Sequence, residues 1–315
     1  MNILIISTPR APTLNVGSNG LGRHVYDFII KFVEKKDKVT VISHPGSVFD
    51  PDMNIHRYNF TDERTYVQDV INVIRKEKYD VIIDNTHYKI LSQVCGGEFP
   101  ILNFIHDEEC PYMPPNTLLG NTKQQKRYVN GKVYKTGIIF KNYPLFPINK
   151  REKYFSFCGK LEKRKGYDIA LEAAKRAGVD LIFAGPDVDR KAHILPKWIG
   201  EVIDRDEFFK FVGSSKALYY PSRSDAGGMG IWEAAALGTP TLTTIQSGAE
   251  CNVIHEKTGY VAQTFQDLID YTSLISESQP DPEEVRENAK QIWDLDTNFE
   301  KIYNLIERLS NGERW

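Results

Sequence analysis

The sequence lacks the features that mark membrane, metal-binding and disulfide-rich proteins. No apolar run among its 315 residues approaches the roughly 18 residues that a membrane-spanning helix needs. It has only four cysteines, and none is spaced closely enough to another to form a zinc knuckle or a thiol redox motif. The net charge is −2, so the sequence gives no sign of a nucleic-acid partner, and we do not expect one.

What is present is the composition of an ordinary globular protein. Hydrophobic residues make up 41% and charged residues 26%, and the length corresponds to about two domains. The first residues lack the basic segment and cleavage site of a signal peptide, so they are predicted to form a strand. Four unpaired thiols are typical of a reducing compartment. We therefore expect a cytoplasmic protein.

Short apolar runs alternate with amphipathic helical patterns along the whole chain. Strands are predicted at residues 2–7, 38–43, 81–84, 102–106, 154–158, 181–184, 218–220 and 241–244. Helices are predicted at residues 23–34, 63–76, 166–177, 231–237 and 283–309. Repeated strand–helix units with continuously apolar strands predict parallel sheets that are covered on both faces. The predicted fold class is α/β, with two Rossmann-like, doubly wound domains.

The strand–helix pattern restarts at Tyr154, after a segment with two prolines and a charged cluster. We expect an N-terminal domain over residues 1–149 and a C-terminal domain over residues 150–297. A closing helix at about residues 298–315 is expected to pack back on the first domain. Two such domains face each other across a cleft, and open α/β sheets bind ligands at the carboxyl ends of their strands. Functional residues are therefore expected in loops that follow strands.

The first such loop, residues 16–24, is rich in glycine and precedes a helix. Its glycines allow a ligand to approach the backbone, and the helix N-terminus favours an anion, which singles out Gly20. A dinucleotide is disfavoured because no acidic residue ends the second strand. The alternative is an ordinary flexible connection.

Two loops in the second half have the same character. Residues 159–166 read Gly-Lys-Leu-Glu-Lys-Arg-Lys-Gly and end a strand, which suits a phosphate as well as it suits a solvated basic turn. Residues 221–240 contain a glycine-rich turn and then a helix expected to begin near Gly230. Asp225 and Glu233 flank that turn. Carboxylates repel phosphates but accept hydrogen bonds from sugar hydroxyls; the alternative is a capping role for Asp225 and structural burial of Glu233.

His106 is the remaining candidate. It ends a predicted strand of the first domain, where it would face the cleft. A single histidine is more often structural than catalytic, so its position at a strand end is what favours a function.

Taken together, these motifs resemble the retaining glycosyltransferases of family 4, which have the GT-B fold of two Rossmann-like domains. The segment from Asp225 to Glu233 and its continuation Ala-Ala-Ala-Leu-Gly-Thr-Pro resembles the family's Glu-x7-Glu segment. The basic loop resembles the family's Gly-Arg-Leu-x-x-x-Lys-Gly, and the first loop its Gly-Gly-x-x-Arg-His-Val. The motifs occur in the family's order and cover nearly the whole chain.

The resemblance implies a role for each matching residue. Lys160 and Lys165 would neutralise the diphosphate of a nucleotide-sugar donor, and Glu233 would bind its ribose. Asp225 would contact the donor sugar, and His106 would lie near the reacting sugar. The backbone of the glycine-rich segments would cradle the phosphates, at Gly20, Gly228, Met229 and Gly230. The family generally needs no metal or other cofactor, so none is expected.

Three residues depart from the family pattern. Asp225 replaces a glutamate, Lys160 replaces a common arginine, and Asn19 replaces a glycine. Asp225 shortens the carboxylate side chain, and Lys160 lacks the bidentate guanidinium of arginine. The identity of the donor sugar is therefore open, and so is the question whether activity is reduced. These departures do not remove the predicted diphosphate site.

The resulting hypothesis is transfer of a hexosyl group from a nucleoside-diphosphate sugar to an acceptor hydroxyl, with retention of configuration. One alternative is a GT-B-like nucleotide-sugar 2-epimerase, which would need more acid and base groups at the strand ends of the first domain. Another is a silent nucleotide-sugar-binding or scaffold protein.

The acceptor stays open, as does the base of the donor. Residues 111–135 combine lysine, arginine and tyrosine, which suits a glycan, a glycolipid or a peripheral contact with a membrane, although a solvated loop is commoner.

Overall fold

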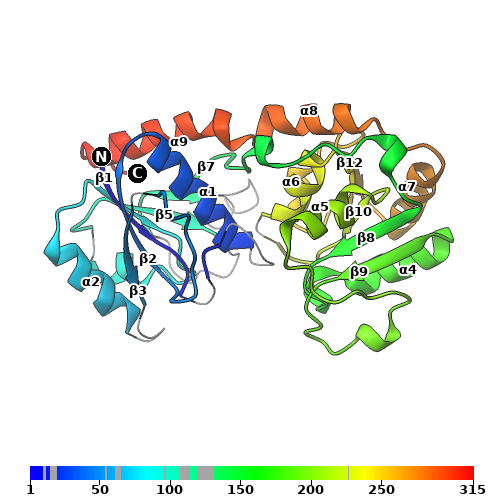
Figure 1. Ribbon diagram of the computed structural model, residues 1–315, viewed down its shortest axis with the longest axis horizontal. Helices are drawn as coiled ribbons and strands as arrows, with labels where there is room; N and C mark the ends of the chain where they lie inside the picture. Colours follow the sequence, from blue (N-terminus) through cyan, green and yellow to red (C-terminus); the bar gives the residue numbers. More distant parts are fainter. Residues whose placement is uncertain are drawn as a thin grey trace. The chain divides into compact units, whose positions relative to one another are not determined.

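The computed structural model describes residues 1–9, 12–14, 20–53, 55–60, 65–95, 97–106, 114–119, 131–225 and 227–315. The chain divides into two compact units, each with its own parallel sheet (Figure 1). Unit 1 comprises Met1–Thr136 and Asp296–Trp315, and unit 2 comprises Gly137–Leu295. Within the described ranges, no helix combines the length and the apolar character needed to cross a membrane.

Unit 1 is built on a seven-stranded parallel sheet in the order β3-β2-β1-β4-β5-β6-β7. The strands are β1 (Asn2–Ile6), β2 (Lys38–Ser43), β3 (Ile55–Asn59), β4 (Val81–Asp84), β5 (Ile101–Ile105), β6 (Thr117–Leu119) and β7 (Lys132–Val133). The helices of this unit are α1 (Gly20–Glu34), α2 (Tyr66–Lys76), α3 (Ile90–Cys95) and α9 (Leu295–Ser310), of which α9 starts one residue before the unit does.

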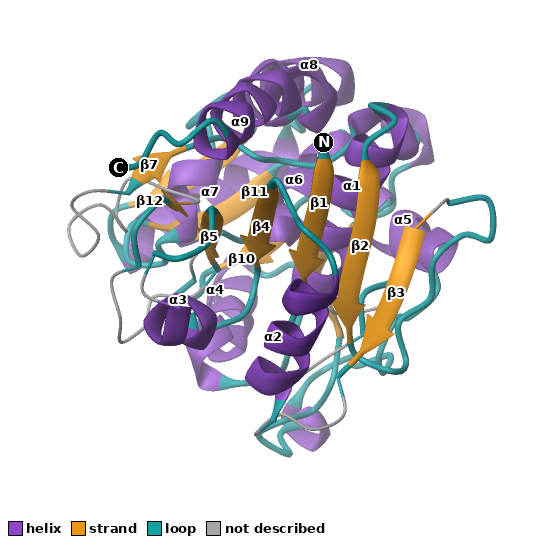
Figure 2. Cartoon of the chain, turned by 90° about the vertical axis from the view of Figure 1, so that its left-hand side faces the viewer, coloured by secondary structure: helices purple, strands orange, loops and turns teal. Residues whose placement is uncertain are grey.

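The central strands of unit 1 are buried on both faces, as continuously apolar strands should be. All four residues of β4 are buried, and β1 is buried from Ile3 onward. Figure 2 shows β3, β2, β1 and β4 side by side. Because β2 and β3 extend the sheet from one side of β1 while β4 and β5 extend it from the other, the chain order reverses between β1 and β4.

Helix α9 packs on α1 within unit 1. The ring centroid of Phe299 lies 5.1 Å from that of Phe32 and 6.0 Å from that of Phe28. The ammonium of Lys31 is 2.9 Å from Oδ1 of Asp296. An apolar seam flanked by an ion pair therefore ties the end of the chain to its first helix.

Unit 2 is built on a five-stranded parallel sheet in the order β12-β11-β10-β8-β9. Its strands are β8 (Tyr154–Cys158), β9 (Asp180–Ala184), β10 (Leu218–Tyr220), β11 (Thr241–Thr244) and β12 (Gly259–Ala262). Its helices are α4 (Tyr167–Ala177), α5 (Arg205–Gly213), α6 (Met229–Ala236), α7 (Phe265–Glu277) and α8 (Pro282–Trp293).

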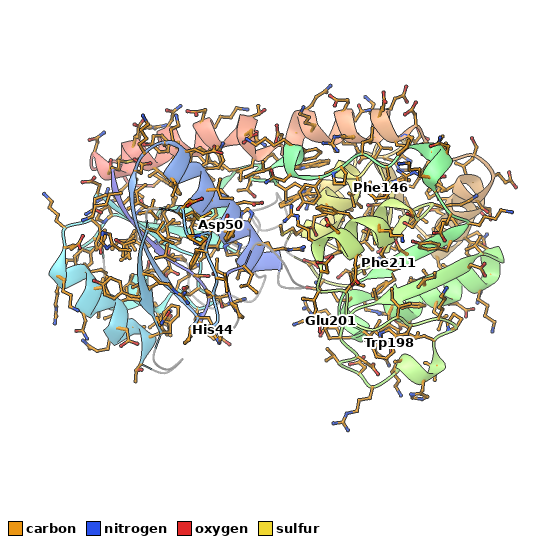
Figure 3. All side chains as sticks on the ribbon, in the orientation of Figure 1. His44, Asp50, Phe146, Trp198, Glu201 and Phe211 are labelled. Atoms are coloured by element: carbon orange, nitrogen blue, oxygen red, sulfur yellow. The ribbon has the colours of Figure 1, made fainter. Side chains whose placement is uncertain are left out.

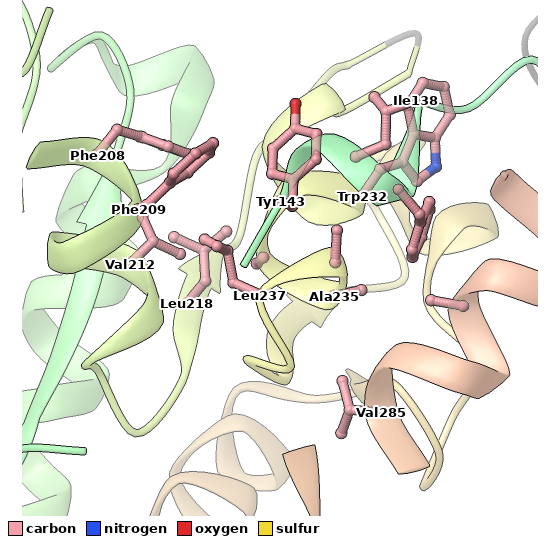
Figure 4. Packing of buried hydrophobic residues seen from close by; sticks show 14 of the residues in the cluster. Ile138, Tyr143, Phe208, Phe209, Val212, Leu218, Trp232, Ala235, Leu237 and Val285 are labelled. Carbon is pink, nitrogen blue, oxygen red and sulfur yellow. The ribbon is translucent and has the colours of Figure 1, made fainter. Parts of the chain in front are cut away.

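Both faces of the unit 2 sheet carry an apolar layer. Phe155 and Phe157 of β8 belong to the layer that includes α4 and α7. Tyr154 and Cys158 of the same strand pack against the opposite layer, which includes α5, α6 and α8 (Figure 4). Alternate residues of a strand point to opposite faces, so β8 supplies both layers. Unit 2 is thus doubly wound.

The first segment of unit 2 is fixed by two half-buried arginines. Arg286 of α8 donates to the carbonyl oxygens of Phe140 at 2.9 Å and Tyr143 at 2.8 Å. Arg151 donates to the carbonyl oxygens of Ser215 at 2.8 Å and Gly238 at 2.6 Å. Burial lowers the pKa of both guanidinium groups, that of Arg151 to about 10. These bonds tie the segment to α8 and to the loops before β10 and β11, and give its backbone carbonyls charged partners.

The predicted fold class is confirmed, and one predicted helix is wrong. Residues 283–309 were expected to form one helix, but α8 ends at Trp293 and α9 begins at Leu295. Asp294 between them adopts an extended backbone, with φ −78° and ψ 117°. Its Oδ1 accepts a hydrogen bond from the backbone N–H of Phe140 at 3.3 Å, and this tertiary contact accompanies the break.

Candidate functional site

Two of the three loops predicted to bind phosphate meet at one point of unit 2. Strand β8 is followed by the basic loop, and β10 by the glycine-rich loop. These two strands are neighbours in the sheet, and the chain order reverses between them. A reversal of this kind leaves a crevice outside the carboxyl ends of the strands, where ligands of open α/β sheets bind. The two loops are more than 50 residues apart in sequence but share this edge.

Direct contacts join the two loops. The backbone N–H of Arg223 donates to the carbonyl oxygen of Arg164 at 2.7 Å. The guanidinium of Arg223 forms a bidentate pair with the carboxylate of Asp168, at 2.7 and 2.8 Å. Gly166 has a φ of +77°, and a Cβ there would lie 2.0 Å from the carbonyl oxygen of Pro221. Only glycine allows the loops to approach this closely.

The carboxylate of Asp225 lies at the centre of the joined loops. Its Oδ1 accepts long hydrogen bonds from the backbone N–H groups of Gly227 at 3.4 Å and Gly228 at 3.3 Å. Its Oδ2 accepts from the hydroxyl of Tyr220 at 2.6 Å and pairs with the ammonium of Lys165. The structure therefore brings together two residues that the sequence predicted as separate parts of the site.

The electrostatics of this cluster favour the ionised carboxylate. Burial opposes ionisation of Asp225, but the charge and hydrogen bond of Lys165, with that of Tyr220, outweigh it and lower the pKa of the carboxyl group. Burial and the same carboxylate raise the pKa of the Tyr220 phenol far above its ordinary value. Near neutral pH the cluster thus holds an ionised carboxylate and a neutral phenol.

The glycine-rich turn exposes backbone at the start of α6. Gly228 has a φ of +66° and immediately precedes Met229, the first residue of the helix. Gly230 follows in the first turn, and both Met229 and Gly230 are half-buried. The loop after β11 supports the turn, because the side-chain amide of Asn252 donates to the carbonyl oxygen of Gly227. Unpaired N–H groups at the start of a helix favour an anion.

Glu233 lies one turn further along α6, and only 1% of it is exposed. Its Oε1 accepts a hydrogen bond from the hydroxyl of Tyr143 at 3.1 Å. Tyr143 belongs to the apolar layer formed with α5 and α6 (Figure 4), and its ring is covered by the guanidinium of Arg205, 4.7 Å from the centroid. Glu233 is therefore held in place by the segment that enters unit 2.

Lys160 differs from the other predicted residues because it is exposed. Its ammonium makes no hydrogen bond or ion pair with the described residues, so it is available to a ligand. It stands at the start of the basic loop, two residues after the end of β8. Trp198 (labelled in Figure 3) donates from its indole to the carbonyl oxygen of Gly185 at 3.0 Å, which fixes the next loop along the sheet.

Gly20 and His106 both belong to unit 1. Gly20 is the first residue of α1, three residues before the predicted start. His106 follows β5, and its Nε2 lies 2.9 Å from Oδ1 of Asn85, which follows β4. Because an amide oxygen only accepts, the imidazole donates from Nε2 and keeps Nδ1 as an acceptor. Burial, assisted by the charge of Lys89, lowers the pKa of His106 well below its ordinary value.

Lys89 itself is buried at the same edge of unit 1. Its ammonium donates to the carbonyl oxygen of Asp84 at 2.8 Å and to that of Thr86, and lies 3.6 Å from Oδ1 of Asp84. This lysine organises the turn after β4, and sequence reasoning missed it. A lysine five residues after a strand carries no recognisable signal.

Tyr143 and Tyr220 were also missed. Tyr220 is the last residue of a correctly predicted strand. Tyr143 begins the proline-containing, charged segment that precedes Tyr154. Their positions were known from the sequence, but the direction of their hydroxyl groups was not.

Some predictions lie outside the described residues. These are Gly17 and Asn19 of the first loop, residues 16–24, and Lys123, Lys126, Arg127 and Tyr128 of the segment 111–135 considered for the acceptor.

The family model that matches this chain falls within unit 2. Residues 141–292, nearly the whole of this unit, match the family model of glycosyl transferases group 1. A comparison with curated protein sequences gave no match.

Solved structures match over the full chain. AviGT4, a glycosyltransferase involved in avilamycin A biosynthesis, is 18% identical over 100% of this chain and 99% of its own, with a TM-score of 0.79. Sucrose-phosphate synthase of Thermosynechococcus elongatus is 15% identical over 99% and 100%, with a TM-score of 0.79. HepE of Anabaena, in complex with UDP and glucose, is 16% identical over 98% and 100%, with a TM-score of 0.76. The chain therefore has the α/β fold of GT-B glycosyltransferases, with two parallel sheets.

Proposed function

We propose that this protein transfers a glycosyl group from a nucleoside-diphosphate sugar to an acceptor hydroxyl, with retention of anomeric configuration. The observation that carries the proposal is the cluster at the point where the chain order of the unit 2 sheet reverses. There, Lys165 and the N–H groups of Gly227 and Gly228 converge on the carboxylate of Asp225, and Glu233 is buried in α6, the helix that follows this turn.

In this proposal the diphosphate binds where the two loops meet. Lys160 and Lys165 neutralise its charge, and Gly228, Met229 and Gly230 donate from the backbone. Negative charge develops on the leaving diphosphate in the transition state. Such a site lowers the barrier mainly by stabilising this charge, because its donors are already in place and need no reorganisation. Two lysines supply the charge that a divalent ion provides in other enzymes, so we propose a reaction without metal.

The two carboxylates bind hydroxyl groups in this proposal. Glu233 accepts from the ribose, and Asp225 contacts the donor sugar, since neither has a favourable interaction with a phosphate. Gly20 and His106 lie at the carboxyl edge of unit 1, where their contribution stays a prediction. Retention follows from a leaving diphosphate that itself helps to deprotonate the incoming hydroxyl on the same face of the sugar.

The comparisons support this choice of reaction class. The matched family consists of glycosyl transferases, and it covers the unit that holds the cluster. Structures of HepE contain UDP and UDP-glucose, which makes uridine donors the first to try with this chain. Guanosine, adenosine, cytidine and thymidine donors belong in the same panel.

The test is turnover with a panel of nucleoside-diphosphate sugars and hydroxyl acceptors, glycans and glycolipids among them. We expect release of nucleoside diphosphate that depends on the acceptor, and a product whose anomeric proton coupling by NMR shows the donor's configuration. Inverted product would contradict retention. Conversion of the donor sugar without an acceptor would indicate an epimerase, and binding without turnover across the panel would indicate a binding or scaffold protein.

A further inference from the structure

The anion cradle of unit 2, defined as the N–H groups of Gly227 and Gly228 with the ammonium of Lys165, already holds an anion. That anion is the side chain of Asp225. Each of its oxygens accepts two hydrogen bonds, one pair from the backbone at 3.3 and 3.4 Å and the other from Lys165 and Tyr220. Only 12% of this side chain is exposed.

These donors overlap with those that the proposed function assigns to a diphosphate. Two negative groups cannot share them, because like charges at hydrogen-bonding distance from the same donors repel. The length of the side chain matters here. An aspartate reaches the turn that immediately follows it, and its carboxylate then caps the N–H groups two and three residues later.

Tyr220 fixes the carboxylate in this position. Its hydroxyl donates to Oδ2 of Asp225 at 2.6 Å. Its ring lies directly under the turn, since a Cβ on Gly228 would be 3.3 Å from Cε1 of the ring and one on Gly230 would be 3.5 Å from Cε2. The phenol is thus packed against the cradle and aimed at its occupant. Being neutral, it has no strong attraction of its own for a diphosphate.

We infer that Tyr220 is a positioning residue that holds Asp225 in the anion cradle, so that a nucleoside diphosphate binds only by displacing this carboxylate. The inference rests on the proposed function and deepens it. Displacement frees the carboxylate to accept hydrogen bonds from the sugar hydroxyls of the donor. A sugar nucleotide therefore regains part of the binding free energy that displacement of the carboxylate costs the bare diphosphate.

The experiment is calorimetric titration of the wild-type protein and three variants with the five common nucleoside diphosphates. Asp225→Asn removes the competing charge, and Tyr220→Phe removes only the hydroxyl that holds it. Glu172→Gln is the matched control, because it removes one carboxylate from the adjoining helix α4, where the partner is Arg176 of the same helix rather than the cradle. Thermal unfolding of each variant monitors folding.

We expect Asp225→Asn to bind the bare diphosphate about tenfold more tightly than the wild type, the scale of one charge-assisted hydrogen bond. Tyr220→Phe should bind it about threefold more tightly, and Glu172→Gln should be unchanged within twofold. A purely structural role for Tyr220 predicts equal or weaker binding instead. With the matching sugar nucleotide, the gain in Asp225→Asn should be smaller than with the bare diphosphate.

Three other outcomes separate this inference from the proposed function. Wild-type binding of a diphosphate with equal or weaker binding by both folded variants overturns the inference and leaves the proposed function standing. Binding by Asp225→Asn alone, with none detected for the wild type, supports displacement in its strongest form. Absence of binding in the wild type and in both variants overturns both.

Discussion

Tyr143 and Glu233 are 90 positions apart in the chain, and a hydrogen bond of 3.1 Å joins them. Both side chains are almost fully buried, at 3% and 1% exposure. One belongs to the segment that enters unit 2 and the other to the helix that opens the anion cradle. The carboxylate proposed to bind ribose is therefore oriented by a residue outside the family-like motifs.

Tyr143→Phe tests this orientation. Loss of the hydroxyl removes a buried hydrogen bond to Glu233, which should lower the free energy of unfolding by about 1 kcal/mol. A nucleoside diphosphate should bind about fivefold more weakly, while inorganic pyrophosphate should be unaffected. Tyr154→Phe is the control, because its hydroxyl bonds to the carbonyl oxygen of Phe211 in the same unit. Equal losses of affinity in the two variants would reject a specific role for Tyr143.

Lys165→Ala and Glu233→Ala should weaken binding to different parts of the donor, the diphosphate and the nucleoside respectively. Removal of Lys165 should weaken binding of a nucleoside diphosphate at least tenfold and leave the nucleoside nearly unchanged, because the lysine acts on charge. Removal of Glu233 should weaken both, because both carry ribose. Lys163→Ala controls for charge, as this exposed lysine is in the same turn. If Lys163→Ala matches Lys165→Ala, the effect is general to a basic surface.

Gly166→Ala should damage both folding and binding. A methyl group there would meet the carbonyl oxygen of Pro221 at 2.0 Å, in a left-handed backbone that alanine resists. We expect a loss of about 3 kcal/mol in the free energy of unfolding by denaturant titration. Gly178→Ala shares the left-handed backbone, with φ +66°, but has open space. Its expected loss is about 1 kcal/mol; a similar loss in both would mean that the loops do not touch.

His106 should make stability depend on pH. The folded-state pKa of its imidazole lies well below the ordinary value of 6.5, so the unfolded chain binds the proton more readily. Its contribution is complete above about pH 7 and is lost as pH falls through 6.5 toward the lowered folded pKa. His106→Gln should therefore flatten denaturation midpoints between pH 7 and 5 relative to the wild type. Parallel curves for the two proteins would show that burial does not disfavour the charged imidazole.

The strands and most long helices were predictable because each carries its own local pattern. Continuous apolar runs identified β4 and β8 with their observed bounds, and amphipathic spacing identified α4 to within one residue. Several short or partly exposed elements were not predicted. Strand β3, for example, contains no fully buried residue, so it lacks the apolar signal of its neighbours. The break at Asp294 depends on a contact with Phe140, which no local pattern records.

The candidate site was predictable in its components but not in its pairing. Spacing and residue type singled out the two loops that contain Lys165 and Asp225, and the resemblance assigned both residues to one donor site with different roles. Only the fold shows that the carboxylate of Asp225 pairs with the ammonium of Lys165. The tyrosines that hold Asp225 and Glu233 lay beyond sequence reasoning, because the direction of a phenol hydroxyl follows from packing.

The central claim is that unit 2 binds a nucleoside diphosphate where the loops after β8 and β10 meet. The most direct measurement is calorimetric titration of the wild-type protein with each nucleoside diphosphate and with the matching nucleoside. The account predicts that one diphosphate binds at least about 100-fold more tightly than its nucleoside, a difference of about 2.7 kcal/mol. Equal affinity for the two, or no binding of any diphosphate, would contradict it.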